Sequence, residues 1–118
     1  MINFLIETKE ILKHNNKSEK DVLWVGNTES CISWQEFVEI ANFEYDNELG
    51  IQKIAEDLLV VGENWWLERH EYDGSEWWEY KELPKKPVKN KFIITTFCGI
   101  SDYLNLEKIN RLWLEQNN

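Results

Sequence analysis

The chain has 118 residues, of which 42% are hydrophobic, and it carries a formal charge of −9. This length allows one domain with one substantial core, and the apolar fraction excludes an intrinsically disordered chain. The acidic balance argues against direct nucleic-acid binding, which needs a basic surface, but it suits a partner that is itself basic. We therefore expect a single folded domain over residues 1–118.

Helices are predicted mainly in the first half of the chain. Residues 2–14 carry apolar side chains at helical spacing, typical of an amphipathic helix that faces a core, with a dimer seam as the alternative. Ser33 and Glu36 form a capping-box pattern that begins a second helix, which we expect to end near Asn42. Residues 51–57 indicate one or two further helical turns.

Strands are predicted between and after these helices. Residues 21–25 form a short strand, and residues 31–32 a brief return strand. Residues 58–61 are apolar without alternation, which is typical of a central strand. Residues 91–98 have the β-branched and aromatic composition of a strand, and a last helix is expected over residues 104–116.

The segment Leu58–Leu83 is the stretch around which the chain is organised, and it holds four of the seven tryptophans. Aromatic runs flank residues 73–75 (Asp-Gly-Ser), which is a strong hairpin signal. A two-residue Asp-Gly loop would set Glu68 opposite Glu79, a destabilising like-charge pair, whereas a three-residue loop sets Arg69 opposite Glu79. We therefore predict the three-residue loop.

This register predicts which side chains share a face of the hairpin. One face carries Trp66, Glu68, His70, Tyr72, Trp78 and Tyr80. The other face carries Trp65, Leu67, Arg69, Trp77, Lys81 and Leu83. Both faces contain tryptophan, so one of them leaves aromatic area near solvent, and the sequence leaves open which. The predicted fold class is α+β: a small antiparallel sheet centred on the Trp-rich hairpin and flanked by three to four short helices.

Residues with catalytic or metal-binding chemistry are few and scattered. Cys31, Cys98, His14 and His70 are the residue types of a Cys2His2 zinc site, but none lies at knuckle spacing from another. We expect no cofactor, with a structural zinc as the alternative. The carboxylates beside His70 lie on a convex hairpin tip instead of a cleft. We therefore predict that the chain is not an enzyme, and a small metal-dependent hydrolase around His70 is the alternative.

The sequence contains no recognisable targeting or membrane segment. The first residues become charged at Glu7, too early for a secretory signal, and no apolar run approaches the length of a membrane span. Cys31 and Cys98 are expected to be reduced thiols. We predict a cytoplasmic protein, monomeric or weakly dimeric, with no membrane role and no direct nucleic-acid contact.

Tryptophan interleaved with glutamate on the hairpin is typical of a protein-binding surface. Such a surface suits an arginine-rich partner through charge and cation–π contacts. Trp24, Trp34 and Trp113 are assigned to the core instead. The predicted partner-binding residues are Trp66, Glu68, Glu71, Tyr72, Asp73, Glu76, Trp77, Trp78 and Glu79.

The stretch Glu56–Tyr80 (EDLLVVGENWWLERHEYDGSEWWEY), preceded by FVEIANFEYD at Phe37–Asp46, resembles a family of small proteins encoded by phages and prophages of Gram-positive bacteria. The likeness covers roughly residues 34–84 and is most specific in the tryptophan hairpin. It implies a mobile-element origin and brings no catalytic residues. By analogy of size, charge and source with anti-CRISPR proteins, we expect a phage-encoded inhibitor of a host defence protein, with the CRISPR nuclease Cas9 as the leading candidate. A phage replication or virion accessory subunit is the alternative.

Overall fold

A computed structural model describes residues 1–88, together with Arg111 and Leu114. The chain divides into two compact units, Met1–Pro84 and Lys85–Asn118, each described by itself. The first unit contains every helix and strand named below. The predicted strand at residues 91–98 and most of the predicted helix at residues 104–116 lie outside the described residues. The single domain over residues 1–118 stays a prediction.

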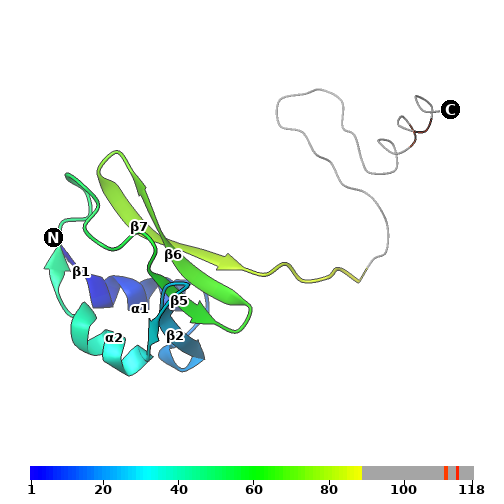
Figure 1. The fold of residues 1–118 in the computed structure, drawn as a ribbon, viewed down its shortest axis with the longest axis horizontal. Helices are drawn as coiled ribbons and strands as arrows, with labels where there is room; N and C mark the ends of the chain where they lie inside the picture. Colours follow the sequence, from blue (N-terminus) through cyan, green and yellow to red (C-terminus); the bar gives the residue numbers. More distant parts are fainter. Residues whose placement is uncertain (89–110, 112–113, 115–118) are drawn as a thin grey trace. The chain divides into compact units, whose positions relative to one another are not determined.

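The first unit combines two α-helices with two antiparallel sheets (Figure 1). The helices are α1 (Phe4–His14) and α2 (Trp34–Ala41). The strands are β1 (Ile2–Asn3), β2 (Val22–Gly26), β3 (Cys31–Ile32), β4 (Glu44–Tyr45), β5 (Leu59–Gly62), β6 (Trp65–Tyr72) and β7 (Ser75–Glu82). The larger sheet has the order β3-β2-β5-β6-β7, and β1 pairs with β4. The predicted α+β class is confirmed, although the described residues form two α-helices instead of three to four.

α1 begins two residues later than predicted, because the first two residues of the predicted helix pair with β4 as a strand. The Asn3 side chain caps the helix by accepting a hydrogen bond from the Ile6 N–H at 3.0 Å. The helix buries Phe4, Leu5, Thr8 and Leu12. Its apolar stripe therefore faces the core, as predicted.

α2 begins where the sequence predicted. The Ser33 hydroxyl accepts a hydrogen bond from the Glu36 N–H at 3.1 Å, and the Glu36 carboxylate accepts one from the Ser33 N–H at 3.3 Å. This capping box satisfies backbone donors that have no partner inside the helix. The helix buries Trp34, Phe37 and Ala41. Of the helices in the described range, none has both the length and the apolar character needed to span a membrane.

The prediction of helical turns at residues 51–57 is wrong, because this segment forms an irregular loop. The N–H groups of Lys53 and Ile54 donate to the Glu76 carboxylate at 2.7 and 3.1 Å. The Lys53 ammonium donates to the Leu49 carbonyl at 2.7 Å. A carboxylate from β7 thus satisfies donors that a helix would have bonded to its own carbonyls.

The prediction of a three-residue hairpin loop is also wrong. The loop between β6 and β7 consists of Asp73 and Gly74, whose φ angles are 48° and 89°. Positive φ at both positions is what a type I′ turn requires, and Asp-Gly is a preferred sequence for it. Glu68 consequently lies opposite Glu79, the pair that the predicted register avoided.

The two-residue loop changes which side chains share a face. We call the side of the larger sheet that packs on α1 and α2 the inner face, and the opposite side the outer face. Trp78, predicted to share a face with Trp66, lies on the inner face and is 3% exposed. Tyr80 moves to the inner face with it. Trp77 lies on the outer face and is 36% exposed.

The hydrophobic core lies between the inner face and the two helices. The ring of Phe4 on α1 stacks on Trp78 with centroids 5.6 Å apart, and meets Phe37 on α2 edge to face at 5.8 Å. The strands of the larger sheet contribute Val25, Val60, Trp65, Leu67 and Trp78 to this core, and β4 contributes Tyr45. Much of the inner face is therefore occupied by packing against α1 and α2.

Candidate protein-binding surface

The outer face of the hairpin carries several of the predicted partner-binding residues. Trp66 and Glu68 lie on β6, and Trp77 and Glu79 lie on β7, with Glu68 opposite Glu79. Their side chains alternate with the inner residues, so they project to the same side of the sheet. Neither described α-helix covers this side, since the buried residues of both helices pack on the inner face (Figure 1).

Glu68 is held in place by its neighbours on β6. Its Oε1 accepts a hydrogen bond from Trp66 Nε1 at 2.7 Å, and its Oε2 lies 2.7 Å from His70 Nε2. The Trp66 hydrogen bond, followed by the His70 hydrogen bond, lowers the pKa of Glu68 below its usual value. These contacts also help to offset repulsion from Glu79 across the strand pair. The outer face therefore presents a fixed, charged carboxylate beside indole rings.

The hairpin tip contains three more of the predicted residues, Glu71, Tyr72 and Asp73, all of them exposed. Tyr72 is 76% exposed and follows the alternation of the outer face. Glu71 follows the alternation of the inner face, so it lies on the other side of the strand. Only Tyr72 therefore extends the aromatic part of the outer face toward the tip.

The outer face continues from the hairpin onto β5 and β2. Val61 pairs with Trp66 on one side and with Trp24 on the other. An open groove of about 560 Å³ lies there. Its lining consists of Trp24, Leu59, Val61, Trp66 and residues 27–31. We give the name Trp–Glu surface to Trp24, Trp66, Glu68, His70, Tyr72, Trp77 and Glu79.

Trp24 was assigned to the core from the sequence, but it is only partly buried and lines the outer groove. Its neighbour Val25 is fully buried. Successive strand residues face opposite sides of a sheet, so a core position for Val25 places Trp24 outside. That alternation is the sequence signal that identifies Trp24 as a surface residue.

Glu76 and Trp78, both predicted to bind a partner, lie in the interior. Glu76 is 2% exposed, and the indole Nε1 of Trp78 donates to the Thr8 hydroxyl at 2.8 Å. The two-residue loop turns both side chains to the inner face. The surface available for contact therefore lacks these two residues.

Glu76 belongs to a buried network around Arg69. Arg69 Nη2 donates to Glu76 Oε1 at 2.8 Å and to the Tyr45 hydroxyl at 3.1 Å. The guanidinium also lies over the rings of Phe4 and Trp78, 5.3 and 4.9 Å from their centroids. Buried ion pairs of this kind are costly to break by removal of one partner. The network therefore holds the hairpin tip against α1 and β4.

Glu7 joins this network from α1. Its Oε1 accepts a hydrogen bond from the Tyr45 hydroxyl at 2.6 Å, and its Oε2 lies 3.7 Å from Arg69 Nη1. Burial raises the pKa of Glu7, and the Tyr45 hydrogen bond and the Arg69 charge offset this only in part. The site therefore favours the neutral form of this carboxyl more than water does.

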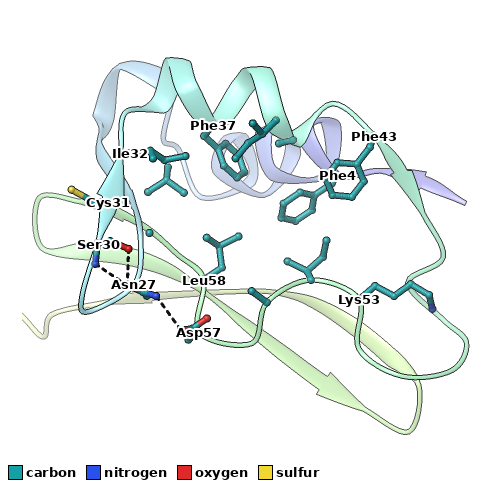
Figure 2. Close-up of a pocket in the computed structure, with 16 residues that line it drawn as sticks. Phe4, Asn27, Ser30, Cys31, Ile32, Phe37, Phe43, Lys53, Asp57 and Leu58 are labelled. Atoms are coloured by element: carbon teal, nitrogen blue, oxygen red, sulfur yellow. Dashed lines mark hydrogen bonds between the residues drawn. The ribbon is translucent and has the colours of Figure 1, made fainter.

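A second hollow, of about 450 Å³, lies beside α2, the β2–β3 turn and residues 53–58 (Figure 2). The apolar part of its lining includes Phe4, Ile32, Phe37, Ile40, Phe43 and Leu58. Figure 2 shows Lys53 at one end and, at the other, Asn27, which donates to Asp57 at 3.2 Å. These polar groups are already engaged within the chain, Lys53 with the Leu49 carbonyl. The hollow thus fits a small apolar group better than a polar substrate.

The residues considered for zinc occupy separate places where they are described. His14 is exposed on α1, His70 lies beside Glu68 on the outer face, and Cys31 is an exposed free thiol. Cys98 lies outside the described residues. Within the described ranges, no group of three or more His, Cys, Asp and Glu side chains is placed to hold a metal ion.

Comparisons of the chain with protein-family models, with curated proteins and with solved structures found no match. The Trp–Glu surface is therefore interpreted from its own chemistry. It offers aromatic contact area, a fixed carboxylate and a second carboxylate on the neighbouring strand. This combination is suited to binding a protein that presents cationic side chains.

Proposed function

We propose that this chain is a phage-encoded protein that acts by binding, and that its Trp–Glu surface contacts and blocks a basic surface of a host protein. The observation that supports this most is the outer sheet face, which Trp24, Trp66 and Trp77 share with Glu68 and Glu79 and which no described helix covers. Rigid aromatic side chains are the usual anchors of protein interfaces. Carboxylates around them add charge complementarity and discriminate against acidic partners.

The charge of the chain favours the same kind of partner. A net charge of −9 accelerates encounter with a positively charged protein. Once bound, an arginine of the partner has both an acceptor in Glu68 and an indole face in Trp66 or Trp77 for a cation–π contact. Charge and aromatic contact thus act on the same cationic group.

The proposed target is a host defence nuclease, with Cas9 as the first candidate. A nuclease that binds nucleic acid carries a basic groove, and an acidic protein can occupy that groove in place of the phosphate backbone. The resemblance to phage proteins implies a mobile-element origin, which fits a host-directed role and a phage-directed role alike. A partner encoded by the phage itself, in replication or in the virion, is the competing assignment.

The test is binding of the full chain to purified Cas9, measured by biolayer interferometry at low and high salt. We expect the E68K/E79K variant to associate about tenfold more slowly at low salt, with a smaller difference at high salt. The matched control E39K/E56K changes the net charge equally at exposed residues outside the Trp–Glu surface. It is expected to retain most of the association rate.

Equal loss of association in both variants would mean that only net charge matters, and would contradict the Trp–Glu surface. Because E68K also removes an acceptor from Trp66 and His70, circular dichroism and an E68Q/E79Q variant separate misfolding from loss of charge. If the unaltered chain does not bind Cas9 at low salt, Cas9 is rejected as the target. Specific capture of a phage replication or virion protein from infected cells would then favour the competing assignment.

A further inference from the structure

β7 lies at one edge of the larger sheet and has a strand on one side only among the described residues. Residues that flank a two-residue hairpin loop form a hydrogen-bonded pair, and such pairs alternate along antiparallel strands. The backbone groups of Ser75, Trp77, Glu79 and Lys81 therefore bond to β6. Those of Glu76, Trp78, Tyr80 and Glu82 point away from it, toward the open edge.

One hydrogen bond of the chain supports this assignment. The N–H of Glu76 donates outward to the Asn47 carbonyl at 2.8 Å, so the 46–50 loop covers the turn end of the edge. Within the described part of the chain, the backbone groups of Trp78 and Tyr80 have no hydrogen-bond partner. Among the described residues, the middle of β7 thus offers unpaired donors and acceptors in strand geometry.

A groove of about 310 Å³ lies between α1 and this edge. It is lined by Glu7, Glu10, Ile11, His14, Trp77 and Trp78. The Glu7 side chain is 16% exposed, and Glu10 is exposed on the next turn of α1. On the other side of the strand, Glu79 and Trp77 belong to the Trp–Glu surface. Carboxylates and indoles therefore flank the open edge on both sides.

We propose that β7 accepts an extended, basic segment of the partner protein as an added strand. Backbone hydrogen bonds to Trp78 and Tyr80 hold the segment, and its alternate side chains lie in the α1–β7 groove and against the Trp–Glu surface. Arginine or lysine side chains in the groove approach Glu7 and Glu10. This proposal rests on the proposed function and adds the way in which the partner is held.

A second copy of this chain is a less suitable occupant of the edge. Pairing two β7 strands would bring together two chains that each carry a charge of −9. Glu79 and Glu82 on each strand would add local repulsion. A basic segment would instead be attracted to the same carboxylates.

The test uses a synthetic peptide that alternates arginine with valine, together with two backbone-methylated forms, one methylated at every arginine and one at every valine. In an added strand, alternate N–H groups bond to β7 and the others point away. We expect one methylated form to bind the full chain about tenfold more weakly for each hydrogen bond lost, while the other keeps the affinity of the parent peptide. Amide hydrogen exchange at Trp78 and Tyr80 is expected to slow in the complex.

A protein variant gives an independent readout. E10K is expected to weaken binding of the parent peptide about fivefold, whereas E39K on α2, which makes the same charge change, is expected to leave it unaltered. Glu39 is exposed, as Glu10 is, and does not line the α1–β7 groove.

Several outcomes would overturn the added strand. They are equal affinities for the two methylated forms, no binding of the parent peptide, and Trp78 and Tyr80 amides that are already protected in the free chain. Protection that rises with protein concentration alone would assign the edge to a second copy. None of these outcomes affects the comparison of E68K/E79K with its control on Cas9, so the two proposals fail separately.

Discussion

Charged side chains inside the fold determine how the hairpin meets the rest of the chain. Arg69 has no exposed side-chain area, and its nearest carboxylate, on Glu76, is 2% exposed. Each of these ions makes the burial of the other tolerable, since a single buried charge loses its hydration without compensation. Arg69 Nε and Nη1 have no hydrogen-bond partner in the described residues. The guanidinium is therefore held by its hydrogen bonds to Glu76 and Tyr45, by the longer ion pair with Glu7 and by the flanking aromatic rings.

Glu7→Gln is expected to raise the melting temperature at neutral pH. The pKa of Glu7 is raised in the fold, so its contribution to stability is fully present below the unfolded value of about 4.5 and is lost as the pH rises through the folded value. Glutamine keeps an acceptor for the Tyr45 hydroxyl and removes the buried charge. Thermal unfolding followed by circular dichroism should show a gain at neutral pH that shrinks below pH 4.5.

The exposed Glu10 on the same helix provides the control, and Glu10→Gln is expected to leave the melting temperature nearly unchanged. A Glu7→Gln variant that is less stable than the parent at neutral pH would show that attraction to Arg69 outweighs the cost of burial.

At the scale of secondary-structure elements, the hairpin loop between β6 and β7 has the largest effect on which side chains reach the outer face. A three-residue loop that included Ser75 would shift the pairing of β7 with β6 by one residue and place Trp78 on the outer face. The Asp73-Gly74 turn therefore decides which tryptophan is available for contact. It also sets which backbone groups of β7 point to the open edge.

Gly74→Ala is expected to lower the free energy of unfolding by about 1 kcal/mol, because Gly74 has a φ of 89°, which strains any residue with a Cβ atom. The added methyl meets only ordinary contacts, with nearest atoms at 3.5 Å, so the cost arises from the backbone. Urea unfolding measures the change. Ser75→Ala, one position later on β7, should have little effect, and equal stability of Gly74→Ala and the parent would contradict the type I′ turn.

Elements with local signals could be predicted from the sequence. The Ser33 capping box, the stripe of α1 and the strands near residues 21–25 and 58–61 all appear close to their predicted bounds. The segment 51–57 could not be assigned correctly, because its N–H groups bond to Glu76, more than twenty positions further along the chain. A sequence pattern that covers only a few neighbouring residues does not include such a distant partner.

The candidate surface was predictable only in part, for a related reason. Interleaved tryptophan and glutamate correctly located Trp66, Glu68, Trp77 and Glu79 on one hairpin, and the structure brings these four together on the outer face. The register was predicted from the charge repulsion between Glu68 and Glu79 alone. The prediction did not include the hydrogen bonds from Trp66 and His70 that hold Glu68. That omission placed Trp78 on the wrong face and left Glu76 among the surface residues.

In the first unit, the two faces of the larger sheet have different roles. The inner face, with α1 and α2, supplies the core, and every residue of the described core cluster lies between Phe4 and Trp78. The outer face and the β7 edge contribute little to that core. Substitutions on these surfaces should therefore change binding with little effect on folding, which makes the charge variants above interpretable.

A fragment of residues 1–88 is expected to fold on its own, because Met1–Pro84 forms one compact unit that contains the described core cluster. Dispersed amide resonances and a cooperative urea transition would establish this. A shorter fragment that ends before β6 loses Trp65, Leu67 and Trp78 from the core and should remain unfolded. Failure of the 1–88 fragment to fold would show that residues 89–118 contribute to stability.

The distribution of tryptophans between the two sheet faces has an optical consequence. Trp34, Trp65 and Trp78 are shielded in the core, whereas Trp24, Trp66 and Trp77 retain contact with solvent on the outer face. A neutral quencher such as acrylamide quenches the fluorescence of an indole only by direct contact. The emission of the described tryptophans therefore separates into an accessible and a protected fraction. A molecule seated on the outer face shields the accessible fraction, and one seated in the hollow beside α2 does not. The chain thus carries its own fluorescent indicator of where a partner binds, without any attached dye.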